Sequence, residues 1–244
     1  MSTRNKGLFI GLAVGGAGIL AVLGWGAATL PRPGNDLDVL ALQCSDIPVT
    51  DSPYPGMVWV PGGNFTMGAE GTYFEEGPAF ETSVAGFWIG QHEVTNAQFA
   101  EFVRATGYLT LAERGIENPT SGELIPGSAV FSPHVSDEPV NPFAGWWQFL
   151  ADANWQQPEG PGSSIKGREN HPVVHIAYED AQAYAQWAGH ALPTEAQFEF
   201  AAQSSLRRDL AGTYQSNTWQ GLFPFQHDTQ DGFVGTAPVG CYSA

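Results

Sequence analysis

Residues 171–202, HPVVHIAYEDAQAYAQWAGHALPTEAQFEFAA, predict a strand, a helix, a tight break and a second helix. The apolar residues Val173, Val174 and Ile176 fit a short buried strand. Apolar side chains then recur at steps of three and four residues, which is the spacing of one helical face. They are Ala181, Tyr184, Ala185 and Ala188.

The break between the two helices contains residues with special backbone requirements. Gly189 stands where the C-terminus of a helix favours a positive φ angle. Pro193 prevents the first helix from continuing, and Thr194 with Gln197 three residues later forms a capping box. We therefore expect the second helix to begin directly after Thr194.

Upstream of this stretch, short strands are expected. Val58 and Val60 alternate around Trp59, which is the period of a strand, and Pro-Gly-Gly at 61–63 marks a turn. The residues Phe-Trp-Ile at 87–89 predict a further strand.

A helix is predicted to follow these strands, because Thr95 and Gln98 form another capping box. Gly107 is expected to end this helix. Its inward face carries Phe99, Phe102 and Val103.

The remaining composition defines the domain organisation. Residues 31–55 are rich in proline, aspartate and small polar residues and are typical of a linker. Residues 116–157 combine proline and glycine with bulky aromatic residues, which favours long packed loops rather than repeats. Residues 56–244 are therefore expected to form one α+β domain with a few helices, many short strands and much irregular chain.

Several of these motifs resemble, in the same order, those of the formylglycine-generating, or sulfatase-modifying factor, family. The most specific is the block at 171–202, with its Trp-Ala-Gly and Leu-Pro-Thr-Glu-Ala sequences. Further blocks are similar at 57–68, 91–99, 107–110, 153–161 and 217–233. The resemblance implies the sulfatase-modifying-factor fold, which is related in outline to C-type lectins.

The resemblance also implies an activity. Family members oxidise a cysteine of a substrate peptide to Cα-formylglycine with O₂ and copper, and so activate sulfatases. Their catalytic cysteine pair follows a Gly-Asn-x-Trp-Glu-Trp segment, and neither occurs up to Ala244. Because soft thiolates hold Cu(I), the chain as given has no copper site, and we expect a C-terminally truncated member with an incomplete fold.

Three interpretations of the function stay open. The first is a formylglycine-generating-type oxidase domain that is inactive as this truncated chain. The second is a non-catalytic, membrane-anchored binding or assembly module of the same fold, favoured by a departure from the family pattern at 203–209. The third is a related oxidase that acts on another small or peptide substrate.

A structural calcium ion is implied by the motif Asn-x-Trp-Gln-Gly followed by Asp-Gly-Phe, which is the family's first calcium site. The ligands here would be the side chains of Asn217 and Asp231 and the backbone carbonyls of Thr218 and Phe233. Spacing alone is less specific, because Asn and Asp in a glycine-rich loop are commonly turn formers.

The resemblance further suggests a groove for a peptide or protein substrate. In this chain it would be framed by Asn154, Trp155, Pro158 and Glu159. The alternative for Trp155 is packing within the loop. No residue is assigned as catalytic.

His171 and His175 are four residues apart, a spacing that suits a metal site only on a helix. In the expected strand they would lie roughly 13 Å apart along the chain. We therefore expect structural roles for both.

The N-terminus predicts a membrane anchor. Residues 7–30 carry no charge, and a helix over them would span roughly 36 Å against a hydrocarbon core of about 30 Å. Arg4 and Lys6 precede it, which places residues 1–6 in the cytoplasm and the domain on the exported, periplasmic or extracellular, side. A cleaved signal peptide, with a site near 26–28, is the alternative.

The net charge is −16, with 25 acidic and 9 basic residues. Such a surface repels nucleic acids and anionic lipid headgroups, so neither is expected as a partner. Membrane contact is expected only through the N-terminal helix.

The chain has two cysteines, Cys44 and Cys241. In an exported protein they could form one disulfide between the linker and the end of the domain. Two free thiols are the alternative.

Overall fold

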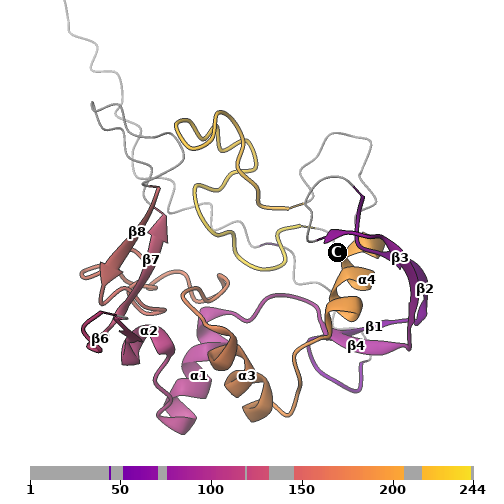
Figure 1. Cartoon of the computed structure of the whole chain (residues 1–244), viewed down its shortest axis with the longest axis horizontal. Coiled ribbons are helices and arrows are strands. Elements are labelled where there is room, and N and C mark those ends of the chain that lie inside the picture. The colour runs from indigo at the N-terminus through magenta and orange to yellow at the C-terminus, as the bar shows by residue number, and fades with distance from the viewer. Residues whose placement is uncertain are drawn as a thin grey trace, which may run out of the picture. The chain divides into compact units, whose positions relative to one another are not determined.

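The computed structural model describes residues 44, 52–70, 76–118, 120–131, 146–205 and 216–242 (Figure 1). All of them belong to one unit of the chain, Leu42–Ala244. The predicted membrane helix at 7–30 lies outside the described residues. Within the described part, no helix is both long and apolar enough to cross a bilayer.

Two antiparallel strand pairs open the domain. β1 (Met57–Val60) pairs with β4 (Phe87–Gly90), and β2 (Gly63–Met67) pairs with β3 (Phe80–Val84). Trp59 lies opposite Trp88, and their rings are 5.4 Å apart between centroids. The strands predicted at 58–60 and 87–89, and the turn between β1 and β2, are therefore confirmed.

The expectation of loops throughout 116–157 is wrong in part. β5 (Ile116–Glu117) pairs with β6 (Leu124–Ile125), and β7 (Gly127–Phe131) pairs with β8 (Trp147–Ala151). These strands are too short to show a clear alternation of polar and apolar residues, and in each pair the partners are separated by intervening chain. Pairing across such a separation is a tertiary effect that local composition does not reveal.

The first long helix, α1 (Asn96–Thr106), follows the predicted pattern. Thr95 and Gln98 form the capping box, with Thr95 N–H donating to Gln98 Oε1 at 2.9 Å. Gly107 ends the helix in the left-handed conformation, with φ of 66°, and its N–H donates to the carbonyl of Val103.

Replacing Gly107 by alanine should cost stability through the backbone alone. No atom lies within 4 Å of the position that a Cβ would take, but the positive φ angle disfavours it by about 1 kcal/mol. Gly235→Ala is the matched control, because its Cβ position is equally open and its φ lies outside the left-handed region. Chemical denaturation of both variants measures the difference, and equal midpoints would contradict the explanation.

The block at 171–202 forms two helices, α3 (Tyr178–Trp187) and α4 (Glu195–Ser205). Gly189 has the expected positive φ of 76°, and Thr194 caps α4 through Gln197 at 2.9 Å. The predicted strand at 173–176 does not form. His175 has a φ of 59°, which is incompatible with a continuous extended segment.

An aromatic core joins these helices. Phe99, Phe102 and Trp155 are each at most 2% exposed, and Val173 and Ile176 pack against them although they form no strand. Phe99 contacts Phe102 edge-on at 5.3 Å and Trp155 at 5.4 Å between ring centroids. α1 and α3 lie side by side in Figure 1 because their aromatic residues share this core.

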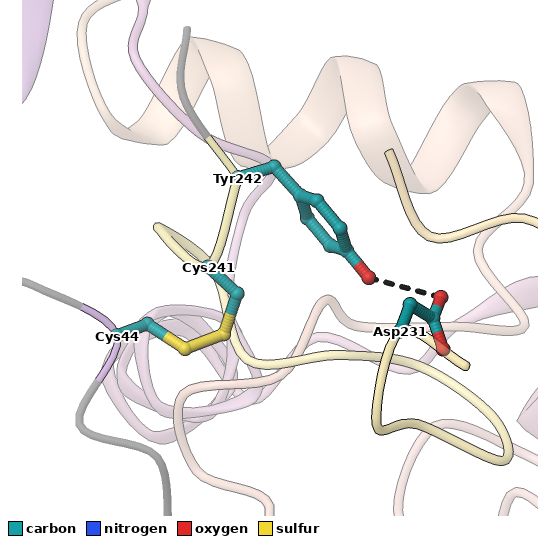
Figure 2. Close-up of a disulfide and its surroundings, with 4 residues drawn as sticks. All are labelled: Cys44, Asp231, Cys241 and Tyr242. Atoms are coloured by element: carbon teal, nitrogen blue, oxygen red, sulfur yellow. Dashed lines mark hydrogen bonds between the residues drawn. A yellow bond between two sulfur atoms is a disulfide. The ribbon is translucent and has the colours of Figure 1, made fainter. Parts of the chain in front are cut away.

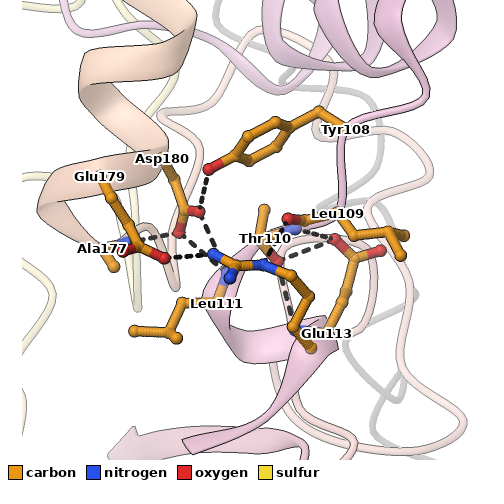
Figure 3. Close-up of polar contacts among 9 residues, drawn as sticks. Tyr108, Leu109, Thr110, Leu111, Glu113, Ala177, Glu179 and Asp180 are labelled. Carbon is orange, nitrogen blue, oxygen red and sulfur yellow. Dashed lines mark hydrogen bonds and ion pairs between the residues drawn. The ribbon is translucent and has the colours of Figure 1, made fainter.

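A buried carboxylate ties α3 to the short helix α2 (Leu111–Arg114) (Figure 3). Asp180 is fully buried, and its Oδ1 accepts hydrogen bonds from the Tyr108 hydroxyl at 2.9 Å and Leu111 N–H at 3.0 Å. Its Oδ2 accepts from Ala177 N–H at 2.8 Å. Burial and the bond to Asp180 raise the pKa of Tyr108, so the phenol stays a donor at neutral pH.

Candidate functional site

Polar groups of the C-terminal segment 216–242 gather around Asp231. Its Oδ2 accepts hydrogen bonds from Gln220 Nε2 at 2.9 Å and from the Tyr242 hydroxyl at 3.1 Å. Its Oδ1 accepts from the Phe233 N–H at 3.1 Å. Gln220 is itself buried, and its Oε1 accepts from the Asp231 N–H at 3.3 Å, which fixes the direction of the amide.

This arrangement favours the ionised carboxyl. Burial raises the pKa of Asp231, but hydrogen bonds from Gln220, Phe233 and Tyr242 outweigh it and bring the pKa below its ordinary value. Burial and the bond to Asp231 raise the pKa of Tyr242 to about 12. At neutral pH, a carboxylate therefore faces a protonated phenol.

The four predicted calcium ligands lie in this segment, and two of them converge. Gln220 Nε2 donates both to the Thr218 carbonyl and to Asp231 Oδ2, so these two oxygens share one positively polarised neighbour. Asn217 Nδ2 donates to the Gly235 carbonyl at 2.6 Å. Among the described residues, no cluster of three His, Cys, Asp or Glu side chains suits a metal ion. A cation here would therefore depend on carbonyl and amide oxygens beside one carboxylate.

The disulfide lies next to this cluster (Figure 2). Cys44 is bonded to Cys241, across a sequence separation of 197 residues and with Cα atoms 4.4 Å apart. Tyr242 follows Cys241 directly, and Figure 2 shows its ring directed from the disulfide toward Asp231. The chain has no free cysteine.

An open pocket of about 360 Å³ adjoins the same segment. Asn217 and Tyr242 line one part of it, and His92 and Glu93 line another. The pocket therefore opens part of the segment to small solutes, including the side chains of Asn217 and Tyr242.

The four residues predicted to frame a peptide groove differ in how far they are exposed and in what they contact. Trp155 is 2% exposed and belongs to the aromatic core with Phe99 and Phe102, so it packs beyond its own loop. The Pro158 carbonyl accepts from His175 Nε2 at 2.7 Å, and Asn154 Oδ1 accepts backbone N–H groups of its own turn. Glu159 keeps 54% of its side chain exposed beside Arg168. Asn154 and Glu159 are thus the more accessible members of this set.

The two histidines act in structural contacts. His171 Nδ1 lies 2.9 Å from Thr236 Oγ1, which links the loop before α3 to the C-terminal segment. His175 Nδ1 lies 2.8 Å from Ser128 Oγ on β7. Burial lowers the pKa of His171, which favours its neutral form.

Glu159 should contribute a pH-dependent stabilisation. Hydrogen bonds from Arg168, at 2.5 and 2.9 Å, lower the pKa of Glu159 below its usual 4.5. The stabilisation is therefore complete above pH 4.5 and is lost as the pH falls through the lowered pKa. Because both side chains are partly exposed, we expect Glu159→Gln to cost at most about 1 kcal/mol near pH 7, and less at lower pH.

Denaturation midpoints of wild type and Glu159→Gln between neutral and acid pH measure this effect. Glu101→Gln is the control, because its ion pair with Arg104 is exposed and 3.9 Å long. A constant difference between wild type and Glu159→Gln at every pH would contradict the role of the carboxylate.

Sequence reasoning missed two residues of the Asp231 cluster. Gln220 is the Gln of the Asn-x-Trp-Gln-Gly motif, so the motif already contained the signal. Tyr242 lies outside the sequence motifs that resemble the family, and only the fold brings its hydroxyl to Asp231.

Comparison with known proteins identifies the fold. The model of the sulfatase-modifying factor enzyme 1-like domain matches residues 45–244. The formylglycine-generating enzyme of Mycobacterium tuberculosis is 43% identical over 201 residues, which cover 77% of this chain. A protein of that name from Mus musculus is 41% identical over 199 residues, covering 76% of the chain.

Another Mus musculus relative is named inactive C-alpha-formylglycine-generating enzyme 2 and is 38% identical over 214 residues, covering 82% of this chain. The aligned residues span 67%, 52% and 66% of the three relatives, in the order given. The matched domain contains both the α1–α3–α4 framework and the Asp231 cluster. The chain therefore belongs to the sulfatase-modifying factor family, whose fold of mixed helices and short strands it shares.

Proposed function

We propose that this domain is part of an oxidase that converts a cysteine of a sulfatase-type peptide to Cα-formylglycine. The observation that carries the proposal is the match over residues 45–244, together with relatives named formylglycine-generating enzyme. The accessible side chains of Asn154 and Glu159 would help to frame the peptide. Both belong to the loop that precedes α3 and is braced by Arg168 and His175.

The cysteines of this chain do not fit the copper site that the family resemblance implies. Both are joined in the Cys44–Cys241 disulfide, so neither offers a thiolate to a soft metal ion. No step of the reaction is therefore assigned to them. We expect residues 1–244 alone to leave the peptide cysteine unchanged.

A second candidate function is a non-catalytic binding or assembly module. The relative named inactive, at 38% identity, shows that the fold is also found in a protein so named. Because both cysteines are joined in a disulfide, neither is available as a thiolate, which favours the same interpretation. In this case the peptide or protein partner would be bound without oxidation.

Deletion of the gene in its source cells separates the two functions. The oxidase predicts that sulfatase-type proteins keep an unmodified cysteine and lose activity, and that the native gene restores both. The binding module predicts that the cysteine is still oxidised in the deletion strain. The latter result would exclude this protein as the required oxidase.

We further propose that a calcium ion binds at Asn217, Asp231 and the carbonyls of Thr218 and Phe233. Support comes from the hard oxygen donors and from the convergence of Thr218 and Asp231 on one amide nitrogen. For binding, the Gln220 amide has to turn away from these two oxygens. The ion would have a structural role, because the groups that donate to Asp231 are neutral: the Gln220 amide, the Phe233 N–H and the Tyr242 hydroxyl.

Calcium should raise the stability of the domain. At about 100 times its Kd, a ligand adds about 2.7 kcal/mol to the free energy of unfolding, which corresponds to roughly 5–10 °C in Tm. Chelation should reverse the change, and Asp231→Asn should abolish it. Asp228→Asn is the control, because Asp228 is an exposed carboxylate of the same loop that accepts from Gln226. A Tm independent of calcium would contradict the site.

Residues 7–30 are proposed to anchor the protein in a membrane, with the domain on the exported side. Support comes from the disulfide, because disulfides persist mainly in oxidising compartments. A protease added outside intact cells should then degrade the domain but not a cytoplasmic marker. A native protein whose N-terminus begins after residue 30 would instead indicate a cleaved signal peptide.

A further inference from the structure

All residues of the segment 216–242 are described, and they form no helix and no strand. Two hydrogen bonds join it to the loop before α3, from Val239 N–H to the Asn170 carbonyl at 2.9 Å and between Thr236 and His171. Trp219 and Phe223 also pack on Phe131 of β7. Because the segment has no hydrogen-bond ladder of its own, we expect it to open more readily than the helices, so that a covalent tie at its end affects its order.

The disulfide is the covalent tie of this segment. It joins Cys241, near the segment's end, to Cys44. The adjacent residue, Tyr242, reaches back to Asp231 with its hydroxyl at 3.1 Å (Figure 2). The hydrogen bond therefore links the two ends of residues 231–242, and the disulfide fixes the residue next to Tyr242.

We propose that the Cys44–Cys241 disulfide holds Tyr242 on Asp231, and that the order of segment 216–242 therefore depends on the oxidation state of these two cysteines. Reduction by a dithiol breaks the S–S bond. Two electrons and two protons pass to the cysteines, which become thiols, and the dithiol becomes a disulfide. Without the cross-link, the end of the segment gains conformational freedom and the hydroxyl of Tyr242 leaves Asp231 more often.

A consequence for cation binding rests on the proposed calcium site. Asp231 Oδ2 would then lose a neighbour that fixes the orientation of the carboxylate. We expect weaker calcium binding in the reduced protein, because the oxygen ligands are less well ordered before binding. Cys44, Cys241 and Tyr242 would thus act as positioning residues for this site.

Amide hydrogen exchange of the full chain, read by mass spectrometry, tests the proposal. The folded protein is compared with the same protein after reduction by a dithiol, and with Cys44→Ser. Exchange within 216–242 should accelerate by roughly tenfold or more, while exchange in α1 stays unchanged. Intact mass after thiol alkylation confirms that the disulfide is broken.

Unchanged exchange in 216–242 after verified reduction would overturn the proposal. Equal acceleration in α1 would overturn it too, because the disulfide would then stabilise the whole domain rather than this segment. Tyr242→Phe keeps the disulfide and should accelerate exchange of the Phe233 amide, which donates to Asp231. No effect of this variant on the Phe233 amide would exclude the part assigned to Tyr242.

Calcium affinity is a separate readout on the same samples. A loss of affinity on reduction supports the positioning role. Exchange that responds to reduction in a protein that binds no calcium would overturn the calcium site, while the dependence of the segment on the disulfide stands.

Discussion

Replacing Asp180 by asparagine is expected to lower the free energy of unfolding by about 2–4 kcal/mol. The carboxylate is fully buried, and its two oxygens accept from the Tyr108 hydroxyl, Leu111 N–H and Ala177 N–H. An asparagine would place an NH₂ group against at least one of these donors. The variant therefore loses acceptors at the N-termini of both α2 and α3.

Tyr108→Phe is the matched variant, because it removes one donor and leaves the carboxylate in place. It should cost about 1 kcal/mol, the usual value of one hydrogen bond. Urea denaturation of both variants measures the ratio. If Asp180→Asn cost no more than Tyr108→Phe, the two backbone N–H groups would not depend on Asp180.

Replacing Phe99 by alanine is expected to cost about 3–5 kcal/mol. Phe99 is 1% exposed and contacts the rings of Phe102, Trp155 and Tyr184, so the truncation leaves a cavity lined by three aromatic residues. Because rings cannot refill such a space without changing rotamers, little of the loss is recovered. Thermal and urea denaturation measure the effect.

Phe198→Ala on α4 is the control for this substitution. Phe198 is 64% exposed, so removing its ring should change the free energy of unfolding by no more than about 0.5 kcal/mol. Equal losses for the two variants would contradict the position of the core at α1, α3 and Trp155.

The helices could be predicted from the sequence because their signals are local. The capping boxes at Thr95 and Thr194, and the glycines at 107 and 189, fix the backbone within one turn. The pairing of β7 with β8 could not be predicted, because it joins residues on either side of a long intervening segment. The strand at 173–176 was wrong because nothing in the residue types shows that His175 adopts a positive φ.

In the candidate site, too, residues that belong to local motifs could be predicted, whereas contacts made only by the folded chain could not. Asn217 and Asp231 come from a motif, and so does Gln220, whose amide joins the Thr218 carbonyl to the Asp231 carboxylate. Tyr242 reaches Asp231 only through the folded chain, and whether Cys44 meets Cys241 depends on a geometry that spacing does not give. Likewise, the Trp155 side chain was expected either in a groove or packed within its own loop, whereas it contacts Phe99 of α1 and belongs to the aromatic core.

The most direct test of the proposed oxidase is the fate of a peptide cysteine. A sulfatase-type peptide is incubated with O₂, copper and the native protein purified from its source cells, and its mass and its reaction with a hydrazide are then measured. The oxidase proposal requires that this protein supply thiolates other than Cys44 and Cys241, which are joined in the disulfide. We expect a hydrazide-reactive aldehyde at the cysteine position, and no change in a peptide that carries serine there. A cysteine that stays a thiol, with the peptide nevertheless bound, would contradict the oxidase and establish the binding module.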